Sequence, residues 1–400
     1  MSQNPEENQP IESLPYAQLS PSQQQQRLNE LALVFLKLGT IAFGGPAAHI
    51  AMMDQEVVNR RRWISREKLL DLLGVTNLIP GPNSTELAIH IGYERAGWRG
   101  LIVAGASFIL PAMLIVWALA AIYARYQTLP QMEWLLYGIK PVIIAVVLQA
   151  VWQLGKKAAK DRPTIIAGIA ALIGYLVGIN EILLLLLLGV LVMLLKRPRK
   201  TQAIGAFLIP FSLLAQVGTS AINAASAGWV NVFLFFLKIG SVLYGSGYVL
   251  LAFLQRDLVE RNQWLTSQQL LDAVAIGQVT PGPVFTTATF VGYLLAGHAG
   301  AIAGTIGIFL PAFVLVWLVN PWVTKLRQSA WASGFLDGVN AASLGLMAGV
   351  SYTLLKTAVV DGLTTVVAVL SMIAVFRFKV NSAWLVLAGG IIGLISNLLF

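Results

Sequence analysis

The chain has 400 residues, a formal charge of +9 and no cysteine. Hydrophobic residues make up 57% of it and charged residues 11%, and its mean hydropathy is +0.73. A soluble domain normally carries about 25% charged residues, so the composition excludes an ordinary soluble fold and predicts a polytopic membrane protein. The lack of cysteine excludes disulfides, thiolate metal sites and cysteine nucleophiles.

The basic residues fall in short runs between apolar segments, such as "NRRRW", "GKKAAKDR" and "KRPRK". Runs of this kind are typical of cytoplasmic loops in multispanning proteins, so no nucleic-acid partner is expected. The three histidines, His49, His90 and His298, show no paired ligand spacing. Neither a metal site nor a cofactor is therefore expected.

Residues 1–30 lack the basic start and apolar core of a signal peptide and are expected to form a disordered tail. Apolar segments of helical length follow, so the predicted fold class is an all-α polytopic membrane protein. These thirteen segments lie near residues 31–53, 74–95, 99–124, 135–153, 163–178, 181–195, 203–220, 229–253, 272–296, 300–323, 334–355, 362–377 and 382–400.

An internal repeat dominates the sequence. "FLKLGTIAFGG" matches "FLKIGSVLYGS", "RRRWISREKLLDLL" matches "RNQWLTSQQLLDAV", and "FILPAMLIVWAL" matches "FLPAFVLVWLV". Each half supplies six apolar elements, which predicts a first repeat over 31–200, a linker over 201–228 and a second repeat over 229–400. Two related halves are typical of secondary transporters, in which the substrate site lies between the halves near the middle of the membrane.

The orientation of the halves depends on the Pro-Gly-Pro element of each. If this element crosses the membrane, the halves are inverted; if it dips in and returns, six crossings separate equivalent positions and favour parallel halves. Basic residues enrich opposite loops in the two halves, which favours inverted repeats under the positive-inside rule. Basic residues at both ends of 65–95 keep a re-entrant hairpin open, and with that hairpin inverted halves would require a linker that does not cross the membrane.

The Pro-Gly-Pro breaks are the principal candidates for a binding site. The first helix is expected to begin at a Ser65 cap and to end before Pro80, and a second helix restarts with Asn83, Ser84 or Thr85 as its cap. A helix that begins at mid-depth directs N–H groups and a positive dipole end at an anion. The alternative is that these prolines and hydroxyls only kink and cap packed helices. The candidate anion-binding residues here are Pro80, Gly81, Pro82, Asn83, Ser84, Thr85, Pro281, Gly282, Pro283, Thr286 and Thr287.

A second break, "FGGP", interrupts the first apolar element and is matched by "YGSG" in the other half. Its glycines serve either the site or close helix packing. Lys37 and Lys238 occupy equivalent positions nearby and are candidates to neutralise a dianion, with snorkelling to an interface as the alternative. The break adds Gly44, Gly45, Pro46, Gly245 and Ser246 to the candidates.

Several further ionisable residues lie within the apolar segments. Glu86 and His90 stand one turn apart after the first break and are candidate proton carriers. Asp272, which aligns with Asp71 in the first half, falls in the amphipathic piece before the second break, where a capping or interfacial role is expected. Lys140 aligns with Asn340, so a shared charge is not required there.

The combination of "FGGP", "IPGPNST" and "FILPA" with the duplication resembles the chromate ion transporter family in its long two-domain form. The resemblance covers about residues 31–400. It implies a multi-pass inner-membrane protein with oppositely oriented halves that exports chromate, driven by the proton gradient. The expected partners are chromate or a sulfate-like anion, protons and the lipid bilayer, with a homodimer as the assembly considered.

Three other functions stay open at this point. Chromate and sulfate have nearly the same shape, so a sulfate or other oxyanion transporter is the first alternative. An anion channel is the second. An intramembrane enzyme acting on lipid phosphates is the third, but it would need a nucleophile or a metal cluster, and the scarcity of histidine and aspartate disfavours it. The protein is therefore expected not to be an enzyme.

Overall fold

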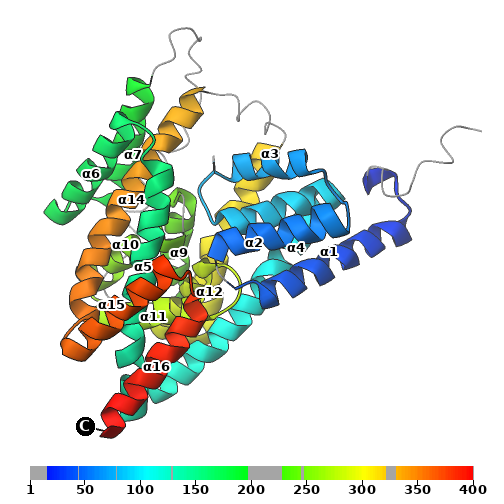
Figure 1. Ribbon diagram of the computed structural model, residues 1–400. Helices are drawn as coiled ribbons and strands as arrows, with labels where there is room; N and C mark the ends of the chain where they lie inside the picture. Colours follow the sequence, from blue (N-terminus) through cyan, green and yellow to red (C-terminus); the bar gives the residue numbers. More distant parts are fainter. Residues whose placement is uncertain are drawn as a thin grey trace, which may run out of the picture.

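The computed structural model describes residues 16–43, 45–77, 79–127, 129–196, 228–244, 247–320 and 330–399. Every regular element within these ranges is a helix, as the sequence predicted (Figure 1). The first half holds η3 (Tyr16–Gln18), α1 (Pro21–Ile41), α2 (Gly45–Met53), η4 (Asp54–Arg60), α3 (Arg66–Thr76), α4 (Asn83–Tyr126), α5 (Pro130–Ala158), α6 (Arg162–Val177) and α7 (Glu181–Leu195). The second half holds α9 (Trp229–Val242), η5 (Gly247–Val249), α10 (Leu250–Phe253), η6 (Leu254–Arg261), α11 (Ser267–Val279), η7 (Val284–Thr286), α12 (Thr287–Val319), α14 (Ala330–Ala358), α15 (Gly362–Arg377) and α16 (Ser382–Leu399).

Four helical segments of the described chain are long and apolar enough to cross a membrane. They lie in equivalent pairs, which supports the predicted duplication. The four segments are Asn83–Tyr126, Pro130–Ala158, Val284–Val319 and Trp331–Ala358.

The first helix begins earlier than expected. α1 starts at Pro21, so residues 21–30 of the expected disordered tail are helical. Ser20 accepts a hydrogen bond from the Gln23 backbone, and the Gln23 side chain accepts one in return, which forms a capping box with proline at the first helical position. The polar composition of residues 1–30 predicted disorder, whereas this capping box starts a helix within them. Residues 1–15 and 201–227 lie outside the described ranges, so the rest of the tail and nearly all of the linker stay predictions.

The Pro-Gly-Pro element of the first half re-enters rather than crosses. Lys68, near the start of α3, pairs with Glu94 at 3.0 Å, and Asn77 and Asn83 are joined by a 2.8 Å hydrogen bond across the break. α3 and the first part of α4 are therefore antiparallel, with Pro-Gly-Pro at the tip of the hairpin. The second half has the same form, because a Cβ on Gly277 would lie 2.5 Å from the Thr287 hydroxyl.

Each hairpin is followed by a second reversal inside the long helix. Ala96 and Gly97 leave the helical region, with φ of +58° at Gly97, and Ala296 and Gly297 do the same in the second half. The pieces on either side pack face to face, because a Cβ on Gly92 would lie 2.2 Å from the Gly100 carbonyl oxygen. Only glycine permits both the turn and this close approach.

Equivalent helices of the two halves run in opposite directions. A Cβ on Gly105 would lie 2.5 Å from the Phe313 ring, and the Trp117 indole donates to His298 Nδ1 at 3.0 Å. Residues later in α4 thus contact residues earlier in α12, so the two helices are antiparallel. The two halves are inverted repeats, as the loop charges predicted.

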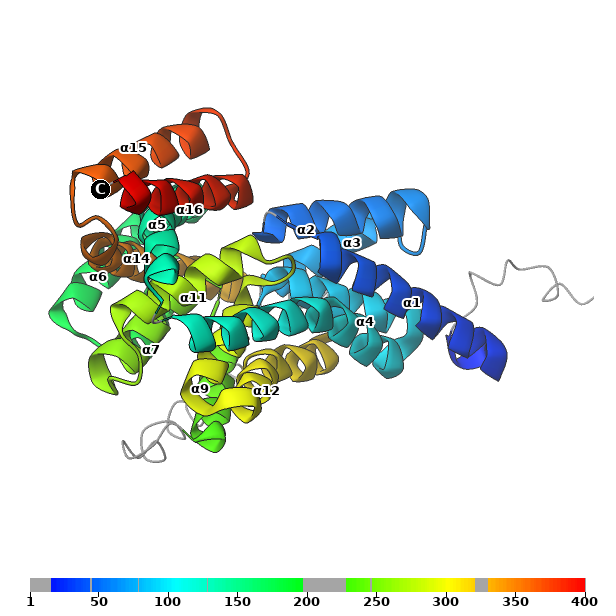
Figure 2. The same cartoon turned by 90° about the horizontal axis from the view of Figure 1, so that it is seen from below.

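The helices form two bundles that do not coincide with the halves. α5 packs against α15 and α16 of the second half, and α14 packs against α6 and α7 of the first. These six helices, here called the arm bundle, lie on one side of the molecule, while α1–α4 lie on the other with α9–α12 between (Figures 1 and 2). We call α1–α4 and α9–α12 the central bundle. The longest arm-bundle helix of each half, α5 or α14, therefore packs against helices of the other half.

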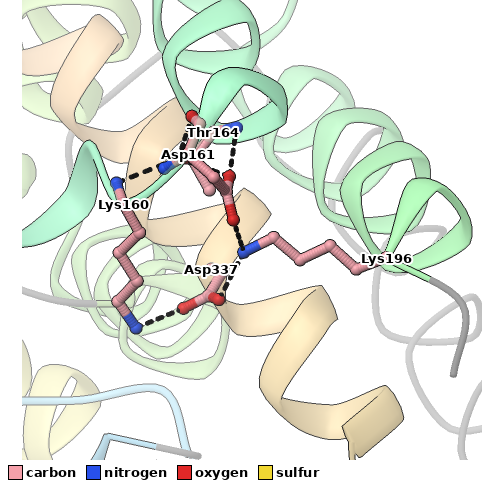
Figure 3. Close-up of polar contacts among 5 residues, drawn as sticks. All are labelled: Lys160, Asp161, Thr164, Lys196 and Asp337. Atoms are coloured by element: carbon pink, nitrogen blue, oxygen red, sulfur yellow. Dashed lines mark hydrogen bonds and ion pairs between the residues drawn. The ribbon is translucent and has the colours of Figure 1, made fainter.

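A polar network joins the halves at one end of the arm bundle (Figure 3). Asp337 of α14 accepts from Lys160 at 2.6 Å and from Lys196 at 2.7 Å. Lys196 also pairs with Asp161 at 2.6 Å, and Asp161 caps α6 by accepting from the Thr164 backbone. The cap of a first-half helix is thereby tied to α14 of the second half.

Candidate functional site

The two Pro-Gly-Pro tips are bonded reciprocally to the opposite half. The Gly81 amide donates to the carbonyl oxygen of Leu243 at 2.8 Å, and the Gly282 amide donates to that of Ala42 at 2.9 Å. Ala42 and Leu243 are the residues at which α1 and α9 end. The four interruptions of the helices thus meet at one buried place, where both tips are shielded from solvent.

No side chain caps the helices that start at the tips. α4 begins after Pro82, and η7 after Pro283, and neither start has a side-chain hydrogen bond. The expectation that Asn83, Ser84 or Thr85 caps α4 is therefore wrong, because Asn83 turns to Asn77 and Ser84 to His49. Uncapped N-termini retain unpaired N–H groups and positive potential, which is the chemistry that binds anions.

Glu86 lies at the first tip and is fully buried. Neither carboxylate oxygen accepts a hydrogen bond from any residue that the structure describes. Its Oε1 lies against the backbone of Gly81, since a Cβ there would approach it to 2.3 Å. Tyr244, at the interruption after α9, interacts with it electrostatically. A buried carboxylate without a cation is costly when ionised, which makes Glu86 a functional candidate.

His49 links the interruption after α1 to the first tip. Its Nε2 lies 3.1 Å from the Ala42 carbonyl oxygen and its Nδ1 lies 3.2 Å from Ser84 Oγ. A carbonyl oxygen only accepts, so Nε2 carries the hydrogen and, in the neutral ring, Ser84 donates to Nδ1. His49 is 1% exposed and packs edge-on against Phe108. No sequence pattern predicts this contact, although His49 follows the "FGGP" break by three residues.

His90 lies one turn beyond Glu86 and is equally buried. Its Nδ1 lies 3.0 Å from the side-chain oxygen of Asn320, at the end of α12. A change of protonation at His90 would thus alter a contact between the halves. The Thr85 hydroxyl, also fully buried, has no hydrogen-bond partner among the described residues.

The second tip has a different chemistry. Thr286 Oγ1 donates to the Pro283 carbonyl and Thr287 Oγ1 to the Val284 carbonyl, both at 2.8 Å. In this conformation the two hydroxyl hydrogens are already used, so the expected donor role of these threonines is not seen. The first tip alone carries Glu86 and His90, and the site is therefore asymmetric.

The two candidate lysines are neutralised by carboxylates. Lys37 Nζ lies 2.6 Å from Glu56 Oε1, and Lys238 Nζ lies 3.9 Å from Asp257 Oδ2 at the equivalent position. Arg60 and Arg61 also approach Glu56. Both lysines therefore already have a counter-charge in the π-helical segments η4 and η6, rather than being unpaired cations at the tips. Their expected contact with a dianion stays a prediction.

The glycine break is described only in part. α2 begins at Gly45, whose φ is +76°, followed by Pro46. Gly44, Gly245 and Ser246 lie outside the described residues. A different pair of glycines serves packing: a Cβ on Gly39 would lie 2.5 Å from the Phe108 carbonyl oxygen, and the equivalent Gly240 meets Ile308 in the same way.

Asp272 does not have the interfacial role that its amphipathic segment suggested. It is 1% exposed, and its Oδ1 lies 3.5 Å from Lys140 Nζ of α5. Tyr123 of α4 donates to its Oδ2 at 2.8 Å. The equivalent residues, Asp71 and Asn340, cannot form such a pair. No sequence pattern brings α5 against α11, so this contact was not foreseen.

Comparisons with known proteins give a consistent result. The family described as "Chromate transporter" matches residues 29–194 and 230–394. The chain is 32% identical over 375 residues to a chromate transport protein of Cupriavidus metallidurans, covering 92% of this chain and 93% of the relative. It is 31% identical to a probable chromate transport protein of Synechococcus elongatus, over 92% of this chain and 95% of that protein. It is 30% identical to a chromate transport protein of Pseudomonas aeruginosa, over 90% of each chain. No solved structure matches the chain significantly.

Proposed function

Because this chain belongs to the chromate transporter family, we propose that it exports chromate across the inner membrane, in exchange for protons, through a site where the two Pro-Gly-Pro tips meet. The observation that carries the proposal is the reciprocal pair of hydrogen bonds from Gly81 to Leu243 and from Gly282 to Ala42. Each bond joins a Pro-Gly-Pro tip of one half to the break that ends the first long helix of the other half. Secondary transporters bind their substrates at such points.

The chemistry of the tips suits a tetrahedral dianion. Two uncapped helix starts face the same buried region, and each offers amide donors and a positive dipole end. Asn83, Ser84 and Thr85 add polar side chains at the first tip. The proposed substrate site comprises these residues and the two Pro-Gly-Pro motifs, together with the break that follows α1.

Glu86 decides when an anion is accommodated. Ionised Glu86 and a dianion would repel each other strongly in a buried region, where charges are poorly screened. The anion therefore occupies the tips when Glu86 is neutral. Because a proton on Glu86 would travel with the anion, exchange for protons requires a second group that releases its proton when the anion binds. Glu86 and His90 are the candidates from the sequence for linking anion binding to protons.

The test is uptake of labelled chromate into inverted vesicles, with and without an imposed pH gradient and with excess sulfate as competitor. We expect saturable uptake that depends on the gradient. Uptake that does not saturate would identify a channel, and full competition by sulfate would broaden the substrate to tetrahedral oxyanions. Folded protein that takes up no chromate contradicts the assignment.

Two variants test the location of the site. Pro80→Ala restores a backbone donor at the tip, and Ser84→Ala removes the hydroxyl that contacts His49. Each is expected to reduce uptake while the protein remains folded in detergent. Wild-type uptake in both variants would move the site away from the first tip.

A further inference from the structure

A buried ion pair connects the two bundles away from the tips. Lys140 of α5 belongs to the arm bundle and Asp272 of α11 to the central bundle, and their side chains are 9% and 1% exposed. α5 and α11 lie side by side (Figures 1 and 2). Removing two charges from water is expensive, so a buried pair of this kind is weak evidence for stability and marks a functional candidate.

A cleft leads from the surface to Asp272. Its volume is about 280 Å³, enough for several water molecules at roughly 30 Å³ each. Thr266, Gln268 and Glu133 form an exposed rim, and Asp272 lies at the floor. The remaining lining is largely polar, so water and protons have a route to the carboxylate. The full lining is Tyr123, Gln127, Glu133, Leu136, Thr266, Gln268, Gln269 and Asp272.

Few titratable groups act on Asp272. Lys140 and Tyr123 interact with it directly, and Glu133 acts on Lys140. Glu86 of α4, which has no hydrogen-bond partner among the described residues, and Lys157 of α5 are not among the groups that act on Asp272. Many other titratable groups on or near the helices packed against α11 have partners of their own. These are Tyr137 with Asp361, Lys156 with Trp152, Arg125 with Tyr126, Tyr248 with Gln278, His298 with Trp117 and Tyr293, Asp337 with Lys160 and Lys196, Lys356 with Tyr352, Asp257 with Lys238 and Arg261, and Glu260 with Arg256.

α11 connects this carboxylate to the substrate tips. Thr280, where α11 ends, lies eight residues after Asp272, or about 12 Å along a helix. Gly282, two residues later, donates to Ala42 in the other half. A change at Asp272 that frees α11 from α5 therefore acts through one short helix on the hairpin that forms the second tip.

We propose that Asp272 is the residue that exchanges protons with the cleft and that Lys140 is its counter-ion. A proton from water in the cleft binds one carboxylate oxygen and neutralises Asp272, which removes the attraction between α5 and α11 and leaves the Lys140 charge without its counter-ion. Release of the proton restores the pair and locks α11 against the arm bundle. This inference rests on the proposed proton-coupled transport.

The experiment uses the full chain in proteoliposomes and two assays. Chromate counterflow measures exchange of chromate for chromate without net proton movement, and the second assay measures chromate movement driven by an imposed pH gradient. For Asp272→Asn we expect counterflow within twofold of wild type and a loss of gradient-driven transport of tenfold or more. Asp71→Asn, at the matched position of α3, is the control and is expected to keep both activities.

Each other outcome has a definite meaning. Gradient-driven transport at the wild-type level in Asp272→Asn overturns the inference. Loss of both activities in a folded variant also overturns it, because the pair is then structural. The double variant Lys140→Gln/Asp272→Asn leaves no unpaired charge and is expected to show the same split. Absence of counterflow in the wild type would instead overturn the proposed function.

A measurement on the wild-type protein covers the case in which the variants do not fold. A hydrophobic carbodiimide reacts with protonated carboxyl groups, and the modified residue is located by mass spectrometry. We expect modification of Asp272 that increases at lower pH and abolishes gradient-driven transport while counterflow remains. Absence of modification at Asp272 under conditions that label other carboxyl groups of the chain overturns the inference.

Discussion

The amide of Gly81 donates a 2.8 Å hydrogen bond to the carbonyl oxygen of Leu243, and this bond has a symmetry-related counterpart from Gly282 to Ala42. The donor of each bond is the amide of a glycine that lies between two helices. The acceptor is the carbonyl oxygen of the residue at which a helix ends. The broken elements therefore satisfy part of one another's hydrogen-bonding needs inside the membrane. The bonds also make each half incomplete without the other, because a tip alone would leave these groups buried and unpaired.

Gly81→Ala is expected to impair transport more than the same substitution at a glycine away from the tips. Its φ of +142° is unfavourable for any residue with a Cβ, and the added atom would lie 2.3 Å from Glu86 Oε1. The tip must shift, and transport is expected to fall roughly tenfold or more, equivalent to about 1.4 kcal/mol. Gly155→Ala is the control, since its added Cβ meets only a Leu344 methyl at 3.5 Å. Equal transport by the two variants in the vesicle assay would contradict the role of the tip.

Glu86→Gln is expected to keep transport and to change its dependence on pH. Glutamine has the size of the protonated acid and no charge to repel a dianion. In the wild type the apparent KM for chromate should rise with pH as Glu86 ionises, whereas the KM of the variant should stay nearly flat. Glu94→Gln, which removes the surface partner of Lys68, should retain the wild-type profile. A folded Glu86→Gln variant that no longer transports would show that the carboxylate itself is needed.

Local signals in the sequence predicted much of the fold. The internal repeat identified the equivalent elements, Ser65 caps α3 as expected, and the helix that restarts after the break ends at Gly97. Loop charges gave the correct relative orientation. Each of these features depends on residues close together in the chain or on the duplication, and for that reason they are visible without a structure.

The contacts that define the site could not be predicted from the sequence. His49 and Ser84 are 35 residues apart, and Lys140 and Asp272 lie in different halves. No periodicity or spacing indicates that α5 of one half packs against helices of the other. Lys37 was a candidate anion ligand, with snorkelling as the alternative, because it lies within an apolar segment near the glycine break. Its partner Glu56 lies beyond that segment, and only the fold brings the two together.

His49→Leu tests the link between the first break and the first tip. Leucine occupies the equivalent position, Leu250, so the second half shows that it fits this kind of packing. The variant leaves the Ser84 hydroxyl without its partner and removes one donor from the Ala42 carbonyl. Chromate uptake is expected to fall about tenfold, or about 1.4 kcal/mol, at unchanged protein level. His49→Gln retains a donor and an acceptor and should recover part of the activity; no difference between the two variants would argue against a polar role.

Asp337→Asn tests whether the polar network of the arm bundle holds the halves together (Figure 3). The change weakens two ion pairs with Lys160 and Lys196, and a loss of about 1 to 2 kcal/mol in unfolding free energy is expected, since the lysines are partly exposed.

The hydrogen bond from Lys196 holds the pKa of Asp161 below its usual range. A lowered pKa means that the stabilisation is present above the usual pKa of aspartate and is lost as pH falls through the acid range. Thermal unfolding of both proteins in detergent at pH 7 measures the loss in the variant, and unfolding of the wild type at a pH below the usual pKa of aspartate measures the acid effect. Tyr137→Phe, at the equivalent position, removes the matching contact with Asp361. If the network holds the halves together, the Asp337→Asn protein is less stable than wild type at pH 7. Equal stability of the two proteins would reduce the network to a surface contact.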